Sequence, residues 1–259
     1  MGERTHYKPG TFCWVGLATS DPAAATAFYT SLFGWSAEEL RAGEAGTLTM
    51  LRLGAADVAI LYRQQPRARA VGAPPHWTSY ISVEDADATA RRAGELGGAA
   101  VFREPFDVRD AGRVAAVQDP TGAIVSLWQP RSRIGAALVN DVGALCWNEL
   151  ATSDLERAKA FFTQLLGWEY ETDEGGYVSI MNAGRLNGGM RVQLEQERGV
   201  PPSWLPYFTV QEAEDAARRA AELGARPLVP ITESHAGRFT VLADPQGAAF
   251  ALFEGDTDL

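Results

Sequence analysis

The sequence predicts an α+β fold made of two tandem copies of one module, and two features of the chain indicate it. The stretch TFCWVGLATSDPAAATAFYTSLFGW, residues 11–35, returns in altered form as ALCWNELATSDLERAKAFFTQLLGW, residues 144–168. The turn-like DPTG at residues 119–122 returns as DPQG at residues 244–247. The copies differ in length only between predicted elements, where loops tolerate insertions. The chain therefore duplicates a module of about 120 residues.

The duplication also sets the predicted domain boundaries. The first module is predicted over residues 1–130, a linker over residues 131–143 and the second module over residues 144–259. Modules of this size can each bury a hydrophobic core without disulfides or metals.

Strands and helices alternate within each module, as the first copy shows. Residues 11–19 have the length and the β-branched and aromatic content of a strand, and Asp21 then caps a helix that Gly34 ends. The module reads βαββ and then βαββ again, so it is itself a doubled unit. The predicted strands are residues 11–19, 47–53, 58–62, 78–83, 113–117 and 124–128, with a short strand near residues 100–102, and the second helix covers residues 85–96.

Charge and composition narrow the class of partner. The net charge is −10, the isoelectric point is near 4.9, and Lys and Arg form no run. Binding of nucleic acid or of an anionic membrane requires clustered cations, so neither partner is expected. No stretch has the apolar length of a signal peptide or a membrane span, which leads us to expect a soluble cytoplasmic protein.

Alternation along the first strand separates its side chains onto two faces. Cys13 and Leu17 are expected to face the helices, and Trp14 and Gly16 the opposite face. A large aromatic side chain flanked by small residues on a concave sheet suggests the wall of a pocket.

The repeated motifs resemble a known family. The segments SDPAAATAFYTSLFGW and DPTGAIVSLWQP, with their counterparts SDLERAKAFFTQLLGW and DPQGAAFALFE, are similar to the vicinal oxygen chelate superfamily of glyoxalases, bleomycin-resistance proteins and extradiol dioxygenases. The resemblance covers residues 11–130 and 144–254. It implies paired βαβββ units that form cup-shaped mixed sheets, with ligand sites inside the cups. The opening GTFCWVGLATSD also resembles two-module actinobacterial members, some of them associated with antibiotic-producing pathways.

The expected metal ligands of the family are missing from this sequence. The resemblance implies His, Gln or Glu at one position of the opening, middle and closing strand of each module. Those positions hold Trp14, Thr78, Ser126, Trp147, Leu205 and Ala251. None of these side chains is an imidazole or a carboxylate, and an indole nitrogen can only donate. The metal-dependent chemistry of the family is therefore not expected here, and no cofactor is predicted.

The histidines and one carboxylate leave an alternative open. His6, His76 and His235 are the only histidines, lie in predicted loops or tails and show no paired ligand spacing. A surface role is predicted for each, and an unconventional metal site built from His76, His235 or Glu149 is the alternative. Glu149 should share the cup-facing side of Trp147 and is the candidate catalytic acid or base; pairing with an arginine is the alternative.

Aromatic and hydroxyl side chains make up the predicted ligand-binding set. Indole and phenyl rings can stack on a flat ligand, and the phenols can bond to quinone or carbonyl oxygens. The same rings could instead pack the interface between the modules. The predicted set is Trp14, Trp77, Tyr80, Ser126, Trp128, Trp147, Trp204, Tyr207 and Phe253.

Three functions are compatible with these features. The first is a metal-independent protein that binds an aromatic or polycyclic small molecule or antibiotic, for sequestration, self-resistance or relief of product inhibition in secondary metabolism. The second is a metal-free enzyme or oxygenase accessory protein with lyase, isomerase or oxygenase-associated activity, in which Glu149 acts as the acid or base. The third is an interaction scaffold whose cups are filled by side chains. The chain is expected either as a monomer with paired modules or as a homodimer.

Overall fold

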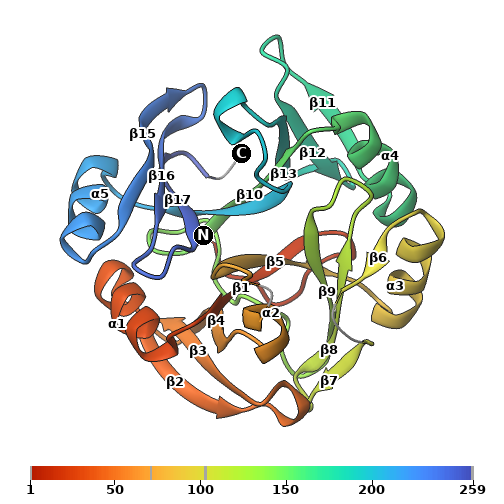
Figure 1. The fold of residues 1–259 in the computed structure, drawn as a ribbon, viewed down its shortest axis with the longest axis horizontal. Coiled ribbons are helices and arrows are strands. Elements are labelled where there is room, and N and C mark those ends of the chain that lie inside the picture. The colour runs from red at the N-terminus through yellow and green to blue at the C-terminus, as the bar shows by residue number, and fades with distance from the viewer. Residues whose placement is uncertain (1, 71, 102–103, 258–259) are drawn as a thin grey trace.

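The computed structural model describes residues 2–70, 72–101 and 104–257. The chain forms two large mixed β-sheets, one from each half, and the longer helices lie at the two flanks of the molecule (Figure 1). The predicted α+β class and the tandem repeat are confirmed.

The first sheet has nine strands in the order β2-β3-β4-β1-β5-β9-β8-β6, with β7 paired to β8. Its strands are β1 Phe12–Thr19, β2 Ser36–Arg41, β3 Thr47–Leu53, β4 Ala56–Arg63, β5 His76–Ser82, β6 Ala99–Ala100, β7 Phe106–Val108, β8 Gly112–Gln118 and β9 Ile124–Pro130. The helices of this half are α1 Pro22–Phe33, α2 Pro66–Ala70 and α3 Ala86–Glu95, with the 3₁₀ turn η1 Gly43–Ala45.

The second sheet repeats this plan with eight strands in the order β11-β12-β13-β10-β14-β17-β16-β15. Its strands are β10 Leu145–Thr152, β11 Glu169–Thr172, β12 Val178–Asn182, β13 Arg185–Val192, β14 Ser203–Thr209, β15 Arg226–Ser234, β16 Gly237–Ala243 and β17 Ala249–Gly255. The helices are α4 Leu155–Leu166 and α5 Ala213–Glu222, with the 3₁₀ turn η2 Glu195–Glu197. In both sheets the first strand pairs in parallel with the fourth and antiparallel with the fifth.

Strand β2 is absent from the βαββ order that the residue pattern predicts. Its sequence SAEELR is exposed at almost every position, because β2 is the edge strand of its sheet and has no buried face. An edge strand without a buried face shows no alternation, which is the main signal for strands. With β2 included, the opening unit is βαβββ, as the family resemblance implies.

Matching end signals define the first helix of each half. The Asp21 carboxylate accepts a hydrogen bond from the backbone N–H of Ala24, and Gly34 ends α1 with a positive φ of 70°. Asp154 and Gly167 do the same for α4. These caps satisfy backbone groups that a helix leaves without partners at its ends.

The two halves share their hydrophobic cores. Helix α1 packs against α5, and α3 against α4, so each flank in Figure 1 combines one helix from each half. The rings of Trp35 and Phe208 lie 5.7 Å apart, and those of Phe28 and Phe250 6.0 Å apart. Between the sheets, the hydroxyl of Ser79 donates to the side-chain oxygen of Asn148 at 2.6 Å. This bond supplies the partner that a buried Asn148 requires.

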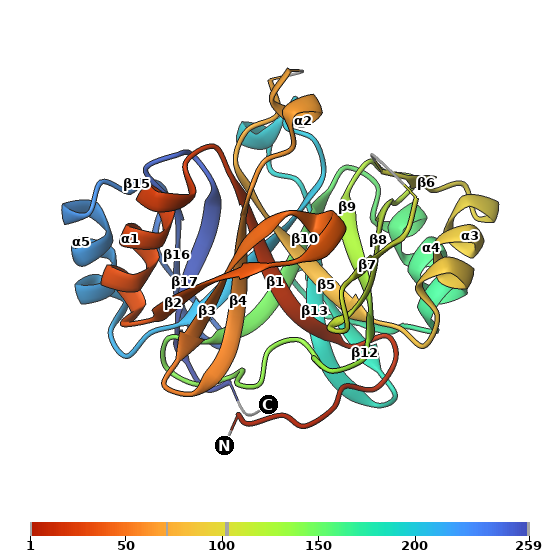
Figure 2. The same ribbon diagram turned by 90° about the horizontal axis from the view of Figure 1, so that it is seen from below.

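The linker and the N-terminal segment cross the same end of the molecule. Figure 2 shows both termini at that end. The hydroxyl of Tyr7 donates to the carbonyl oxygen of Ala136 at 2.7 Å, and Asn140 bonds to the backbone of Thr257 at 2.9 Å. Gly135 is required here, because a Cβ atom would lie 2.4 Å from the Cys13 carbonyl oxygen and its φ is 114°. The linker is therefore part of the packed structure.

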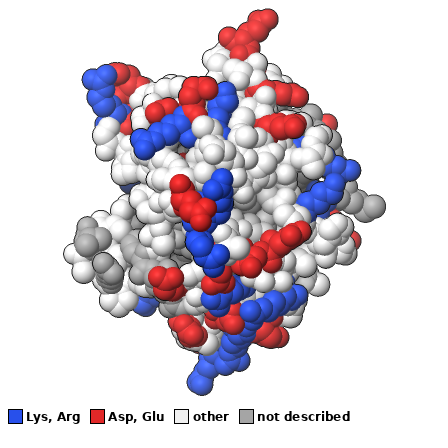
Figure 3. Space-filling view, turned by 90° about the vertical axis from the view of Figure 1, so that its right-hand side faces the viewer, with Lys and Arg blue, Asp and Glu red and all other residues white. Residues whose placement is uncertain are grey.

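Charges of both signs mix on the flank that carries α3 and α4. Figure 3 views this side, and acidic and basic side chains lie next to one another across it. Exposed ion pairs such as Arg92–Glu95 and Lys159–Glu156 belong to these two helices. Among the helices of the described residues, none is long and apolar enough to cross a membrane.

Candidate functional site

The concave face of the first sheet, which we call the first cup, encloses a cavity of about 350 Å³. Its wall includes the indoles of Trp14 and Trp128, which are 3% and 2% exposed and meet edge to face at 5.5 Å. Met50, Ile60 and Val114 add apolar surface from neighbouring strands. Its volume falls in the range of small-molecule sites, and a mostly apolar wall with a few polar groups is typical of them.

Strand register brings four predicted residues together on this wall. Trp14 lies opposite Tyr80 across β1 and β5, and Tyr80 lies opposite Ser126 across β5 and β9. Trp128 follows Ser126 two positions later, on the same face. Trp14, Tyr80, Ser126 and Trp128 all line the cavity. Their part in binding a ligand stays a prediction.

The sequence interpretation missed Tyr62, which lines the same cavity from β4. It lies opposite Ala18 of β1, and both Tyr62 and Tyr80 pack against Gly16. A Cβ atom on Gly16 would come within 3.0 Å of the Tyr80 ring and 3.2 Å of the Tyr62 ring. Burial raises the pKa of both phenols, so they stay protonated at neutral pH. The alternation of LTMLRL and DVAILY could have placed Tyr62 only if the strand register had been known.

Trp77 and Trp204, which belong to the predicted ligand-binding set, lie outside both cups. Trp77 lies opposite Leu17, on the face of β5 turned toward the other half, and its indole N–H donates to the Tyr29 hydroxyl at 2.9 Å. Trp204 packs against Phe12, with ring centres 4.9 Å apart. Each tryptophan is an odd number of residues away from the cup-facing tyrosine of its strand, so strand alternation puts it on the opposite face.

The concave face of the second sheet, the second cup, carries the remaining aromatic candidates. Trp147 lies opposite Tyr207, and the partly buried Trp147 and Phe253 both pack against the small core cluster that contains the buried Tyr207. The indole N–H of Trp147 donates to the hydroxyl of Tyr177 at 2.9 Å. Position 189 must be glycine for this contact, because a Cβ atom there would lie 2.0 Å from the Tyr177 hydroxyl. Tyr177 therefore fills part of the second cup.

Glu149 is held in the second cup by an arginine. The Nε of Arg191 donates to the Glu149 Oε1 at 2.8 Å, and its two terminal nitrogens bind Glu197 at 2.6 and 2.7 Å. These acceptors raise the pKa of Arg191, and Arg191 lowers that of Glu197. Burial, and then the charge of Glu149, raise the pKa of Tyr177. The apolar surroundings expected for a catalytic Glu149 are thus replaced by an ion pair, and its role as an acid or base stays a prediction.

The described side chains of the cups do not fit a divalent metal. A metal site of this family type needs several imidazole or carboxylate donors that converge. In the first cup the central row holds an indole, a neutral phenol and the hydroxyl of Ser126. In the second cup one oxygen of Glu149 already binds Arg191.

The histidines do not supply the missing donors. His76 lies at the wall of the first cavity with its Nδ1 2.9 Å from the Pro74 carbonyl oxygen, and His6 and His235 are exposed. Within the described part of the chain, the one converging group of at least three His, Cys, Asp or Glu side chains contains no histidine and excludes Glu149.

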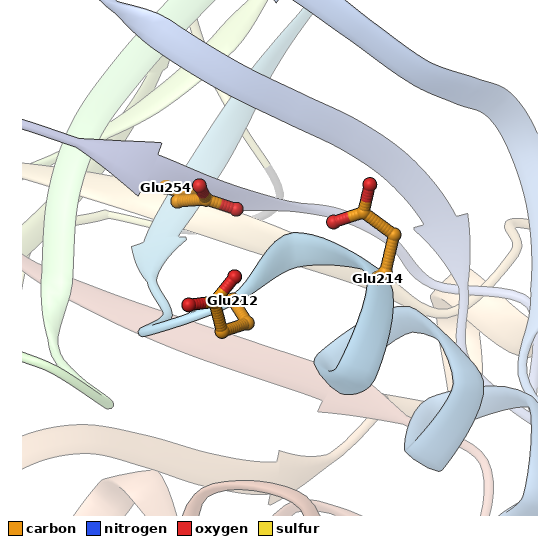
Figure 4. Close-up of side chains that lie close together, drawn as sticks. All are labelled: Glu212, Glu214 and Glu254. Carbon is orange, nitrogen blue, oxygen red and sulfur yellow. The ribbon is translucent and has the colours of Figure 1, made fainter.

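That group is formed by Glu212, Glu214 and Glu254, near the start of α5 and the end of β17. Figure 4 shows the three carboxylates turned toward one another. Arg238 forms ion pairs with Glu214 and Glu254, and Glu254 accepts the backbone N–H of Ala213 at 2.7 Å. An arginine and a helix terminus account for the gathering of these acids, so it gives no reason to infer a metal.

Comparison with known proteins shows the family. The model of the "Glyoxalase/Bleomycin resistance protein/Dioxygenase superfamily" matches residues 11–127, and that of the "Glyoxalase-like domain" matches residues 146–253. A Mycobacterium tuberculosis protein named "Putative glyoxylase CFP32" is 39% identical over 98% of both chains. The "Anthracycline biosynthesis protein DnrV" of Streptomyces peucetius is 32% identical over 96% of this chain and 95% of that protein.

A solved structure agrees at the level of the fold. The 2,3-dioxygenase LapB from Pseudomonas sp. KL28 superimposes with a TM-score of 0.64 and 12% identity, over 95% of this chain and 94% of that one. At this identity the likeness concerns the fold alone. The family matches on both halves and the relative at 39% identity show that this chain belongs to the glyoxalase, bleomycin resistance protein and dioxygenase superfamily, with two such modules in tandem.

Proposed function

We propose that the first cup binds an aromatic or polycyclic small molecule without the help of a metal. The observation that carries this proposal is the cavity of about 350 Å³ whose wall includes the indoles of Trp14 and Trp128. Such a ligand would exchange water for apolar contact over most of its surface, which is the main source of affinity in a pre-formed site. Well-oriented ring contacts add about 0.5–1.5 kcal/mol each.

The relatives suggest the setting of this binding. Two of them are named anthracycline biosynthesis proteins, and anthracyclines are flat, polycyclic and rich in oxygen. We propose that this chain holds a compound of that general kind, as a sequestering or self-protecting protein of secondary metabolism. Among the described residues of the cups, the central side chains do not form a fitting set of metal donors, which supports binding over metal-dependent turnover.

Calorimetric titration with fluorenone, a planar tricyclic ketone, tests the proposal. With the cavity pre-formed, we expect one site and a dissociation constant on the order of 10–100 µM for a ligand of this size. Protein treated with EDTA should bind equally well. Absence of binding by the folded protein, or binding that EDTA abolishes, would contradict the proposal.

A matched pair of variants locates the site. Ala18 lines the first cavity opposite Tyr62, and Ala151 holds the equivalent place in the second sheet opposite Arg191. Ala18→Leu should reduce fluorenone affinity by about tenfold or more, because the added carbon atoms occupy ligand space. Ala151→Leu should leave the affinity unchanged. Thermal melting of both variants checks that each is folded.

A further inference from the structure

We infer that the first cup recognises a carbonyl or hydroxyl oxygen of its aromatic ligand through a cluster of four neutral hydroxyl groups. The cluster consists of Tyr62, Thr78, Tyr80 and Ser126, and we call it the hydroxyl cluster. This inference rests on the proposed function of the same cup and names the chemical class of the ligand, an aromatic compound that carries oxygen on its ring system.

Strand register gathers these four side chains on one wall. Tyr62 lies opposite Ala18, Thr78 opposite Gly16, and Tyr80 opposite Trp14, so β4 and β5 supply hydroxyls to one patch on either side of β1. Ser126 continues the row on β9, opposite Tyr80. All four residues line the cavity. The hydroxyl cluster is therefore next to the space that a ligand would fill.

Glycine at position 16 allows the two phenols to approach each other. A Cβ atom there would be 3.0 Å from Cε2 of Tyr80 and 3.2 Å from Cε1 of Tyr62, so both rings lie against the same backbone atom. Such distances are too short for most side chains to be accommodated without a shift. The equivalent position in the second sheet is Glu149.

The chemistry of the hydroxyl cluster suits an oxygen atom. Burial raises the pKa of Tyr62 and of Tyr80. Against this, hydrogen bonding with Thr78 lowers the pKa of Tyr62, and hydrogen bonding with Ser126 lowers the pKa of Tyr80. Because all four groups stay protonated, each can both donate and accept. Four hydroxyls joined in a row are linked by three hydrogen bonds, and each of these bonds uses one of the four hydroxyl protons. The fourth proton is then free to be donated to a ligand carbonyl.

The second cup shows that the fold does not require this arrangement. By strand register, Arg191 replaces Tyr62, Leu205 replaces Thr78 and Ala251 replaces Ser126. Only Tyr207 matches, as the counterpart of Tyr80. Three of the four hydroxyls thus occur only in the half whose cup contains the cavity, which links the cluster to a ligand rather than to folding.

The test compares fluorenone with fluorene, two tricyclic molecules of the same outline that differ in one carbonyl oxygen. Calorimetric titration of the wild-type protein should show about 3- to 10-fold tighter binding of fluorenone, the effect of one net hydrogen bond. Tyr80→Phe, Tyr62→Phe and Ser126→Ala should each reduce the ratio of fluorenone affinity to fluorene affinity. Tyr170→Phe, which removes a hydroxyl from β11 outside the cups, should keep it.

The outcomes separate this inference from the proposed function. Equal wild-type affinity for both molecules, or a preference that survives all three substitutions, overturns the hydroxyl cluster and leaves aromatic binding in place. Failure of the wild-type protein to bind either molecule overturns both. Circular dichroism and thermal melting verify folding, and Ser126→Ala provides the reading if a tyrosine variant does not fold.

Discussion

The two cups have the same strand order and the same opening Cys-Trp pair, but they treat their interiors in opposite ways. In the first cup Gly16 lies under two tyrosines and the wall surrounds a cavity. In the second cup Glu149 takes the place of Gly16, and a glycine at position 189 makes room for Tyr177. A duplicated fold can therefore keep a cavity in one copy, while polar side chains occupy the corresponding region of the other copy and bond to one another.

The same divergence appears where the halves pack together. On one flank the Trp77 indole donates to the Tyr29 hydroxyl, which donates to Asp244 at 3.0 Å. On the other flank the repeat places Trp204, Phe162 and Asp119 in the corresponding positions. Among the described residues, the Trp204 Nε1 and the Asp119 Oδ2 are buried and have no hydrogen-bond partner. Phe162 has no hydroxyl, whereas the Tyr29 hydroxyl bonds to both Trp77 and Asp244 in the matching site. This difference explains why Trp204 Nε1 and Asp119 Oδ2 have no partner.

The largest effect that tests the contrast between the cups is expected from Arg191→Leu. Glu149 is only 9% exposed in its side chain, and losing the guanidinium leaves its carboxylate without a countercharge. Breaking a buried pair costs several kcal/mol, and the 25% exposure of Arg191 reduces this to about 2–3 kcal/mol. Urea denaturation gives the free energy of unfolding.

Arg198→Leu is the matched control for that loss. Its ion pair with Glu195 is 79% and 78% exposed, so the change should be about 0–0.5 kcal/mol. Equal stability of Arg191→Leu and the wild-type protein would mean that the second cup does not depend on its ion pair. Fluorenone affinity should stay unchanged in both variants.

A smaller, reciprocal effect is expected at the two flanks. Tyr29→Phe should lower the free energy of unfolding by about 1–3 kcal/mol, because Trp77 and Asp244 would both lose a buried partner. Phe162→Tyr should raise the free energy of unfolding by about 1 kcal/mol, because the new hydroxyl can accept from Trp204 Nε1 and donate to Asp119 Oδ2. Urea denaturation measures both.

Either sign can fail independently. A Tyr29→Phe variant as stable as the wild-type protein would show that the Trp77–Tyr29–Asp244 contact contributes nothing net. A destabilised Phe162→Tyr variant would show that the flank has no room for one more oxygen atom, so that overpacking outweighs the hydrogen bonds.

The smallest effect concerns the pH dependence of stability. It compares Asp119, a buried acid whose Oδ2 has no hydrogen-bond partner among the described residues, with Glu197, an acid paired with Arg191. Burial raises the folded-state pKa of Asp119 above its ordinary value of 3.8. The folded state therefore holds a proton that the unfolded state releases, and stability falls as pH rises from about 3.8 through the folded pKa. Asp119→Asn should remove this component of the pH dependence, measured by urea denaturation between about pH 3 and 7.

Glu197 provides the opposite sign. Arg191 lowers its pKa, so its contribution is complete above the ordinary value of 4.5 and is lost as pH falls through the folded value. Glu197→Gln should remove that loss. Parallel pH curves for the wild-type protein and both variants would contradict these assignments.

Much of the fold was open to prediction because its signals are local. Asp21 and Gly34 mark the ends of a helix in the sequence itself, and the repeated stretch after Cys146 doubles the same signals. Strand β2 was missed because an exposed edge strand has no hydrophobic alternation. The cup-facing position of Trp14 followed from alternation, and that of Tyr80 from alternation together with the family's ligand position two residues before it.

The site was less predictable because its contacts depend on register between strands. Trp77 and Tyr80 cannot both face the first cup, since they are three positions apart on one strand, and strict alternation would have excluded Trp77. The roles of Tyr62 and Arg191 depend on which residue of β1 or β10 each one faces. Nothing in the local sequence specifies that pairing, so Glu149 could be recognised as a candidate but its arginine could not.

The sharing of one core by both halves has a consequence for how the chain can be divided. Phe208 and Phe250 of the second half lie among Trp35, Tyr29 and Phe28 of the first. A fragment that ended in the linker would expose the rings of Trp35, Tyr29 and Phe28 to water, because Phe208 and Phe250 would no longer cover them. Although the chain arose as a repeat, it should therefore unfold in a single thermal transition. Neither half should fold on its own when it is separated from the other.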